Sequence, residues 1–490
     1  MRDLYYYQTD VYYRIFSPLL SLSRDWLWFF FDHRINTIMA ASMESGLERV
    51  LNEIDKHGIE FVRFEFGDMH GIARSKIVPA RHFKEKARGI NIPLAHLAMD
   101  PQCKIQPGTP FTEDIGYADG VWVSDFATFR VIPWSKNTAE ILIEPTYNQQ
   151  PVAAYPRYIA RKQIETLTDL GISLLSAHEH EFYVVNRTTK KPLFDKINLR
   201  STLCNYTDPD LVEKLLTNLY GIGINVEMYD TEYAPGQLEI TYKPAFGIRA
   251  ADNAHVFKST VKETAQRCGY TASFMSKPWS DQSGSSGHFC HSLWDIDGER
   301  GLLYDATDDT GLSKLGRHWM AGILEHAPAI SVLMAPTVNC LKRLRQHTFA
   351  AYNATWGVDN RTCALRLKIN GEEGSYIENR MVSSGNNPYL SLAAVIAAGV
   401  DGIKRELTLP DAIVGSAYDE RNLPDGVATL PDTMEDALKA FEDDAVIREA
   451  FGEQFHKCFV ALKMNEREEE IQAENRGDKH WEREMFFDNI

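Results

Sequence analysis

The spacing of apolar and polar residues changes several times along the chain. Residues 42–57 carry apolar side chains at helical spacing and stop at Gly58, which predicts an amphipathic helix. Residues 59–83 alternate apolar and polar positions around glycine-containing turns, which predicts a hairpin of two strands. Strand patterns follow at 121–125, 129–134 and 139–145. This order predicts a small sheet that ends near Tyr147.

A longer second part follows the proline-bracketed segment 148–156, which is the best linker candidate. A helical pattern at 156–170 stops at Gly171 and is followed by a strand pattern at 172–185. Helix and strand patterns then recur, and the tail from 434 to 490 is helix-rich and charged. We therefore expect an α+β protein with an apolar and aromatic N-terminal extension at 1–41, a small domain at 42–147 and a large domain at 148–490.

Composition and charge narrow the possible classes of protein. The chain has 490 residues, of which 44% are hydrophobic and 24% charged, a balance typical of a folded globular protein. The formal net charge of -16 and the lack of a dense basic stripe argue against nucleic acid as a partner. Seven scattered cysteines without a CxxC pair favour a reducing compartment over a disulfide framework or a structural zinc site.

The aromatic opening does not indicate a membrane or secretory segment. The apolar run WLWFFF at 26–31 is flanked by charged residues and is too short to cross a bilayer. The opening residues also lack the order of a basic region, an apolar stretch and a small-residue cleavage site that a secretory signal requires. We expect a cytoplasmic protein that does not use a membrane.

Candidate chemistry begins in the stretch HEHEFYVV at 178–185. In a strand, Glu179 and Glu181 share one face, whereas His178 and His180 share the other and are expected to pack or hydrogen-bond there. Taken alone, such a pair of glutamates is more often a solvated strand face. Further acidic and imidazole groups change that view: Glu232 precedes a Pro-Gly turn and Glu239 follows it, His288 follows a run of small residues, and Glu378 lies two residues before Arg380.

Small residues at 284–287, beginning with Gly284, allow the backbone to approach a ligand closely just before His288. Cys290 shares the strand face of His288, and we interpret it as a core cysteine because a thiolate is too soft for magnesium.

Five carboxylates gathered in one pocket would protonate unless cations neutralised them. Oxygen-rich sites suit Mg²⁺ or Mn²⁺, and these ions commonly bridge to nucleotide phosphates. No P-loop and no dinucleotide fingerprint occurs in the chain. A nucleotide would therefore depend on the metals and on nearby guanidinium groups, for which the candidates are Arg343, Arg361, Arg366 and Arg380.

The order of these motifs resembles the glutamine synthetase family from about Gly58 to the C-terminus. The motifs are ExEF, E…PGQxE, GSSGH, APTVN…KR, NRTxxxR, IExR…NPYL and AAGVDGI. The resemblance implies a small β-grasp-like N-terminal domain and a large catalytic domain with a curved antiparallel sheet flanked by helices. Within the family, segments such as VRFEFGDMHGIARSKIVPA are most similar to lengsin and to ligases that act on larger amines.

The resemblance also implies roles for individual residues. Glu181, Glu232 and Glu239 match ligands of the metal that organises glutamate and the amine. Glu179, His288 and Glu378 match ligands of the metal that binds the ATP phosphates. Arg343 and Arg380 match residues that hold the glutamate carboxylate, with Gly284 beside them, and Arg361 and Arg366 match residues that steady the transferring phosphoryl group. Arg343 and Arg361 are therefore the expected catalytic arginines.

The family relationship further implies a homo-oligomer, a dodecamer of two stacked hexamers in which each site is completed by a neighbour's N-terminal domain. ATP, glutamate and an amine are the implied substrates, with two or more Mg²⁺ or Mn²⁺ ions in each site.

Two departures from ammonia-using members concern the amine site. Phe349 occupies the position of a glutamate that binds ammonium and accepts its proton, and residues 89–102 lack an acidic turn of the same pocket. Tyr376 also replaces a frequent arginine. We therefore expect a ligase that transfers a γ-glutamyl phosphate to an amine larger than ammonia, with Phe349 on an apolar side of the pocket. The alternative is a lengsin-like structural or chaperone protein without turnover that binds intermediate-filament partners of the cytoskeleton.

Overall fold

The structure is a computed structural model that describes residues 43–196 and 199–490. The chain divides into two compact units, Met1–Gly58 and Ile59–Ile490. In the first unit, residues 43–57 form the predicted helix, and Gly58 ends it with a positive φ of 59° that glycine adopts without strain. The extension expected at 1–41 lies outside the described residues.

The second unit contains two sheets. The smaller sheet has the strand order β2-β1-β6-β4-β3, with β5 and β7 also paired to β6. Its strands are β1 (Phe61–Gly67), β2 (Ala73–Pro79), β3 (Ile90–Pro93), β4 (Asp119–Ser124), β5 (Arg130–Val131), β6 (Thr138–Tyr147) and β7 (Gln150–Pro151). Strands β1 and β2 pair antiparallel across the turn at residues 68–72, which is the hairpin that the alternating pattern predicted.

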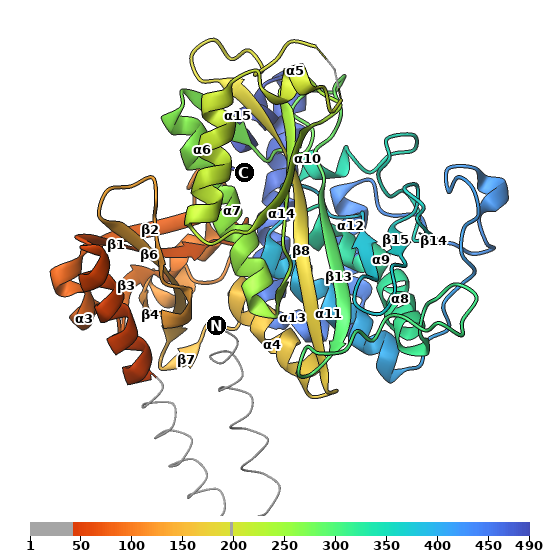
Figure 1. Cartoon of the computed structure of the whole chain (residues 1–490), viewed down its shortest axis with the longest axis horizontal. Coiled ribbons are helices and arrows are strands. Elements are labelled where there is room, and N and C mark those ends of the chain that lie inside the picture. Colours follow the sequence, from red (N-terminus) through yellow and green to blue (C-terminus); the bar gives the residue numbers. More distant parts are fainter. Residues whose placement is uncertain (1–42, 197–198) are drawn as a thin grey trace, which may run out of the picture. The chain divides into compact units, whose positions relative to one another are not determined.

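The larger sheet carries the candidate site. Its order is β14-β15-β16-β13-β8-β10-β9, with β11 and β12 also paired to β8. Its strands are β8 (Ile172–Asn186), β9 (Val226–Thr231), β10 (Gln237–Tyr242), β11 (Ala245–Phe246), β12 (Tyr270–Ser273), β13 (Gly287–Asp295), β14 (Trp356–Val358), β15 (Leu365–Lys368) and β16 (Tyr376–Asn379). The long strands β8 and β13 run side by side through its centre (Figure 1).

Helix α3 (Phe83–Lys86) lies beside strand β2 of the smaller sheet, and the other helices of the second unit belong to the part of the chain that contains the larger sheet. They are α4 (Pro156–Thr168), α5 (Thr202–Asn205), α6 (Pro209–Gly221), α7 (Ile248–Arg267), α8 (Lys314–Glu325), α9 (Ala327–Met334), α10 (Val338–Leu341), α11 (Pro388–Lys404), α12 (Met434–Asp443), α13 (Ala445–Phe451), α14 (Glu453–Asn475) and α15 (Trp481–Phe486). Short 3₁₀ turns lie at η1 (Ala80–His82), η2 (Leu94–Ala98), η3 (Glu113–Ile115), η4 (Phe126–Thr128) and η5 (Glu420–Asn422). The mixture of helices and sheets confirms the expected α+β class.

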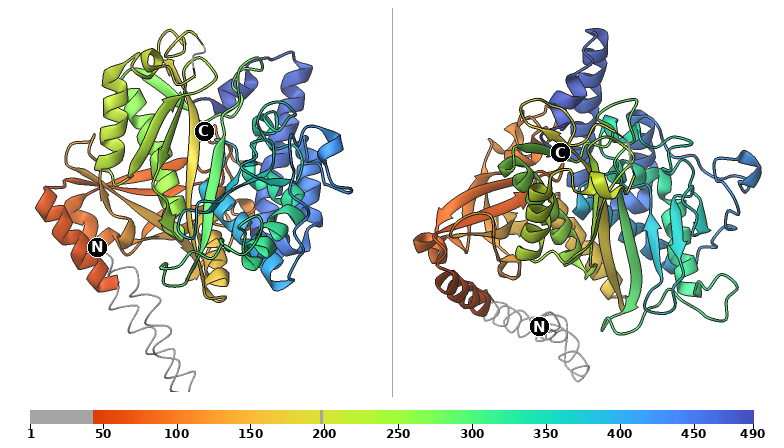
Figure 2. Two further views of the ribbon diagram at one scale, coloured as in Figure 1. Left: turned by 45° about the vertical axis from the view of Figure 1, so that its right-hand side comes forward. Right: turned by 45° about the horizontal axis from the view of Figure 1, so that its top comes forward.

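Helix α7 lies between the two sheets and contacts both. On one side, Arg63 of β1 bonds to Glu263 at 2.5 Å and the His255 ring contacts Glu65 at 3.0 Å. On the other side, the ring of Phe257 stacks on that of His180 of β8, with centroids 5.5 Å apart. Figure 2 shows α7 in green next to the orange strands of the smaller sheet. The face of β8 that bears His180 is therefore covered by α7.

Within 43–196 and 199–490, every helix is too short or too polar to span a bilayer.

Candidate active site

Strand β8 places Glu179 and Glu181 on the face opposite α7. Successive side chains of a strand point to opposite faces, so His178 and His180 point toward α7, where both are buried. Their rings stack with centroids 5.1 Å apart. Burial lowers the pKa of His178 to about 3 and that of His180 well below its usual value, which keeps both rings neutral.

Neighbouring strands bring the other candidate ligands to the glutamate face. Glu239 of β10 lies directly opposite Glu181, and His288 of β13 lies directly opposite Glu179. Glu378 of β16 lies opposite Cys290, two residues beyond His288 on β13. The register of three strand pairs therefore gathers side chains that are up to 199 residues apart in the sequence, the separation of Glu179 and Glu378.

The turn between β9 and β10 adds Glu232. Its N–H donates to the carbonyl of Gln237 at 2.9 Å, which folds the chain back at Pro235–Gly236. Gly236 has a φ of 71°, and a Cβ there would lie 2.6 Å from the carbonyl oxygen of Val184. This turn accepts only glycine without a shift of backbone, and it holds Glu232 next to Glu239.

The six side chains form two groups. In each group, every residue offers one ligand atom, and these atoms all lie within 4.8 Å of one another. In the first group, Nδ1 of His288 is 3.3 Å from Glu378 Oε1 and 3.7 Å from Glu179 Oε2. We call the first the imidazole group, with Glu179, His288 and Glu378, and the second the carboxylate group, with Glu181, Glu232 and Glu239.

The electrostatics of these groups favour a bound cation. Burial and the neighbouring carboxylates raise the pKa of Glu239 to about 9, and burial with carboxylate repulsion raises the pKa of Glu179 and of Glu232 to about 7. Burial also raises the pKa of Glu181. A divalent ion would restore the ionised forms, and a set of carboxylate oxygens is what Mg²⁺ and Mn²⁺ prefer. The residues present therefore fit such ions.

Three arginines border the imidazole group. Arg366 of β15 donates to Glu378 Oε2 at 2.8 Å, and Arg380 also bonds to Glu378. Arg380 further donates to the carbonyl of Phe349 at 2.8 Å and to that of Arg361 at 3.1 Å. The side chain of Arg361 itself is exposed, and its charge contributes to lowering the pKa of His288, after burial and after Arg380 and Arg343.

Arg343 and Gly284 lie beside the carboxylate group. One nitrogen of the Arg343 guanidinium donates to the carbonyls of residues 380, 381 and 382 at 3.0, 3.2 and 2.7 Å, and its buried Nε has no protein partner among the described atoms. A Cβ at Gly284 would lie 2.8 Å from Cγ of Arg343. The backbone at Gly284 therefore lies close to the side chain of Arg343.

The position of Phe349 is fixed by a hydrogen bond to its backbone carbonyl. Its φ is 54°, the residue is 58% exposed, and its carbonyl accepts the bond from Arg380. The role of its ring in an amine pocket stays a prediction. Tyr376, the other departure, lies partly exposed on β16, opposite Lys368 of β15.

Sequence interpretation missed the place of Cys290. Its thiol donates to Glu179 Oε1 at 3.4 Å, and the side chain is partly exposed, so it lines the site instead of the core. Burial raises the pKa of the thiol well above its usual value, which keeps it protonated. The two-residue spacing from His288 was the available signal, because it places both side chains on one face of β13.

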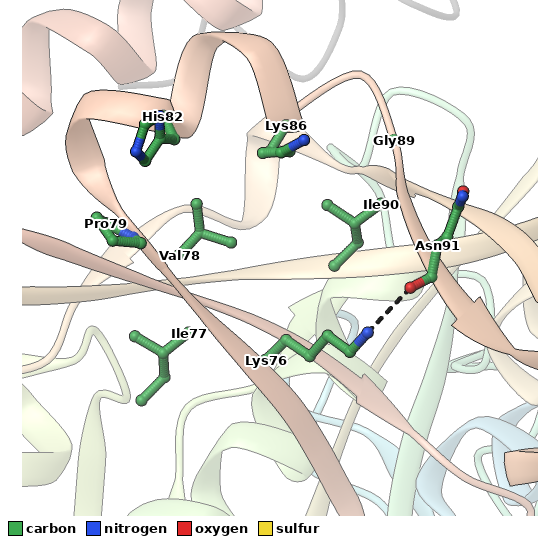
Figure 3. Close-up of a pocket in the computed structure, with 9 residues that line it drawn as sticks. All are labelled: Lys76, Ile77, Val78, Pro79, His82, Lys86, Gly89, Ile90 and Asn91. Carbon is green, nitrogen blue, oxygen red and sulfur yellow. Dashed lines mark hydrogen bonds between the residues drawn. The ribbon is translucent and has the colours of Figure 1, made fainter.

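A hollow of about 570 Å³ lies elsewhere, at the smaller sheet, where the edge strands β2 and β3 approach each other (Figure 3). Nζ of Lys76 bridges the two edges by donating to the carbonyl of Asn91 at 3.0 Å. The lining residues are Lys76, Ile77, Val78, Pro79, His82, Lys86, Gly89, Ile90 and Asn91. This set contains no carboxylate, so it does not share the chemistry of the two ligand groups.

Comparison with known proteins gives the family. Residues 153–486 match the family model described as glutamine synthetase, catalytic domain. Dog lengsin is 37% identical over 448 residues, covering 88% of this chain and 75% of lengsin. A glutamate–isopropylamine ligase from Pseudomonas is 30% identical over 466 residues, covering 92% and 100%. Among solved structures, a GmaS–ADP complex has a TM-score of 0.76 at 25% identity, covering 89% of this chain and 98% of that one. The chain belongs to the glutamine synthetase family.

Proposed function

We propose that this protein is an ATP-dependent ligase that joins the γ-carboxylate of glutamate to an amine larger than ammonia. Members of the family use ATP and divalent metal ions. The observation that carries the proposal is the pair of adjacent ligand groups, five carboxylates and one imidazole, bordered by arginines. Such a concentration of partly or fully buried acidic groups is costly in a protein that binds no cation.

The proposed reaction has two steps. In the first, an oxygen of the γ-carboxylate forms a bond to the γ-phosphorus of ATP, and the bond to ADP breaks. In the second, the amine nitrogen forms a bond to the acyl carbon, inorganic phosphate leaves with the C–O bond electrons, and the nitrogen loses a proton. Bound Mg²⁺ or Mn²⁺ would supply positive charge for the phosphate oxygens and for the glutamate carboxylate.

We assign roles to the residues on this basis. The carboxylate group would hold the ion beside glutamate, and the imidazole group would hold the ion on the ATP phosphates. Arg343 and Arg380 would bind the glutamate carboxylate near Gly284, and Arg361 and Arg366 would neutralise the transferring phosphoryl group, because guanidinium groups pair with phosphoryl oxygens in a planar fork.

The amine is inferred from Phe349. A phenyl ring can neither pair with ammonium nor accept its proton, so the charge recognition used for ammonia is missing at this position. Its exposed ring in the single chain leaves apolar surface for the carbon skeleton of a larger amine. Relatives named glutamate–isopropylamine ligase and gamma-glutamylanilide synthase support an amine of this kind.

Assembly and location are part of the proposal. We propose a dodecamer of two stacked hexamers in the cytoplasm, with domains at 42–147 and 148–490, in which a neighbouring copy's N-terminal domain completes each site. Size-exclusion chromatography with light scattering tests the assembly, and a fully active monomer would contradict it.

The decisive test is phosphate release from ATP in the presence of Mg²⁺, glutamate and a panel of amines that includes ammonia, methylamine, isopropylamine, ethanolamine and aniline. We expect release that requires glutamate and is faster with a larger amine than with ammonia. A matched reaction with Glu232→Gln should lose the activity while retaining the fold. Release that is independent of the amine would indicate an ATPase instead.

A second candidate is a lengsin-like structural protein without turnover that binds cytoskeletal filaments. The identity of 36–37% to lengsins over 443–455 residues favours it. In that case, wild type would bind metal and nucleotide yet release no phosphate with any amine in the panel, and it would co-sediment with intermediate filaments.

A further inference from the structure

An irregular segment at residues 380–387 connects the two ligand groups, and it is buried throughout. It begins with Arg380, which bonds to Glu378 of the imidazole group. Its Ser384 hydroxyl donates to the backbone carbonyl of Glu181 at 2.5 Å, and the N–H of Ser384 donates to the carbonyl of Ser285 at 3.2 Å. The position of Glu181 therefore depends directly on where this segment lies.

Buried backbone outside regular structure needs donors for its carbonyl groups, because water does not reach them. In the 380–387 segment, two cationic side chains meet this need. Arg343 donates hydrogen bonds to the carbonyls of residues 380, 381 and 382. Nζ of Lys258 donates hydrogen bonds to the carbonyls of Ser384 and Asn386, at 3.0 and 3.1 Å. The two cations thus satisfy five carbonyls along eight residues.

Lys258 approaches from the covered face of the sheet. It lies on α7, is 6% exposed, and its ammonium is 5.2 Å from the centroid of the Phe274 ring. The titratable groups that face it across the packing include Cys340 and the two neutral rings of His178 and His180. No carboxylate in the described part of the chain forms an ion pair with it, so its donor capacity is directed to the backbone carbonyls of the segment.

Burial lowers the pKa of Lys258 to about 8, because the ammonium group loses its hydration at this position. An apolar residue of similar length would avoid this loss of hydration. The ammonium group instead orients the carbonyls of Ser384 and Asn386. The side chain of Asn386 in turn contacts Nε2 of His178 at 3.2 Å, on the strand that bears Glu179 and Glu181.

We propose that Lys258 is a positioning residue for the carboxylate group: it holds the 380–387 segment from behind the sheet so that Ser384 fixes the backbone of Glu181. The residue makes no contact with either ligand group, and it acts through Ser384. The effect on turnover rests on the proposed ligase function, whereas the effect on cation binding does not.

The test compares Lys258→Met with Lys262→Met. Lys262 lies on the same helix and is partly buried, but its Nζ donates to the carbonyl of Asn489 at 2.8 Å, away from the segment. Mn²⁺ binding to the full chain is measured by electron paramagnetic resonance in the absence of nucleotide and substrate. Thermal unfolding of each variant is recorded alongside to separate positioning from loss of stability.

We expect Lys258→Met to weaken Mn²⁺ binding about tenfold, which is less than the full cost of losing two buried hydrogen bonds from a charged donor because only part of that cost reaches the ligand group. Lys262→Met should lower the unfolding temperature similarly while leaving Mn²⁺ affinity within about twofold of wild type. Lys258→Arg, which retains donors, should recover part of the affinity. Equal losses in both Met variants, or unchanged Mn²⁺ binding in Lys258→Met, would overturn the proposal.

A serine pair keeps the test decisive if Lys258→Met does not fold. Ser384→Ala removes the bond to Glu181, and Ser383→Ala removes a neighbouring buried hydroxyl that has no protein partner among the described atoms. Ser384→Ala should weaken Mn²⁺ binding, and Ser383→Ala should not; equal binding in the two would overturn the proposal.

With phosphate release as a second readout, Lys258→Met should raise the KM for glutamate more than it lowers kcat. If wild type releases no phosphate with any amine, the ligase proposal fails, and the Mn²⁺ titrations still decide the role of Lys258.

Discussion

Glu181 and Glu239 lie directly opposite each other on the antiparallel strands β8 and β10. Like charges at such positions destabilise a sheet, and burial adds to the cost because the charged form loses its hydration. The raised pKa of Glu239, about 9, is the consequence of both effects. The two side chains of this strand pair therefore repel each other, and a cation bound between them would relieve that repulsion.

The metal-free protein should lose stability as pH rises from about 4.5 toward 9. The folded-state pKa of Glu239 lies above its unfolded value, so the unfolded state releases its proton first, and the free energy of unfolding falls as pH rises through this window. Glu239→Gln should remove the pH dependence that this carboxyl group causes. At pH 8 in EDTA, we expect the variant to gain about 1–2 kcal/mol in free energy of unfolding, which raises the unfolding temperature by a few degrees. Unfolding curves at pH 5 and 8 check this, and an identical pH response of variant and wild type would contradict it.

Adding Mn²⁺ at pH 8 should make wild type more stable than Glu239→Gln. A cation that binds only the folded state stabilises it by about 2.7 kcal/mol at a hundred times its dissociation constant. Wild type should gain this stabilisation at pH 8, whereas Glu239→Gln should gain much less because a ligand is missing. Glu227→Gln is the matched control: this residue of β9 pairs with Lys243, outside both ligand groups, and should respond to Mn²⁺ like wild type.

Phe349→Glu should shift the preference between amines toward ammonia. The new carboxylate can pair with ammonium and accept its proton, contributions of about 10²-fold or more in favourable cases. The measurement is the ratio of kcat/KM for ammonia to that for isopropylamine, in variant and wild type. Phe349→Leu is the control, since it keeps the site apolar and should leave the ratio nearly unchanged. A ratio that does not rise in Phe349→Glu would remove this residue from the amine site.

His326 should stabilise the fold in a pH-dependent manner, independently of the ligand groups. Its ring nitrogens contact Asp444 at 2.6 Å and Asp401 at 2.9 Å, and although burial opposes it, these carboxylates raise the pKa of His326. The stabilisation is therefore complete below the unfolded pKa, about 6.5, and is lost as pH rises through the higher folded value.

His326→Gln should accordingly cost about 1–2 kcal/mol at pH 6 and less at pH 9, measured by denaturant unfolding. His318→Gln is the control, because the His318 ring contacts the backbone carbonyl of Leu407 at 2.8 Å. A cost of His326→Gln that is the same at both pH values would show that the ring is held as a neutral group.

The sequence alone determined the local features of the site. The period-two pattern at 178–185 placed Glu179 and Glu181 on one face and the two histidines on the other, because side-chain direction in a strand follows from backbone geometry. The order of motifs determined the family, since each motif is a short stretch that can be compared without knowing the fold. The α+β class and the first hairpin followed from periodicity in the same way.

Tertiary structure decided which residues meet. Register between β8, β10, β13 and β16 separates the six ligands into two groups, and it brings Cys290 to Glu179. Lys258 reaches carbonyls 126 and 128 residues away, and Phe349 is positioned by a bond from Arg380 to its backbone. These contacts depend on how strands and helices pack after long segments of chain have closed, and no local period encodes a partner at that distance.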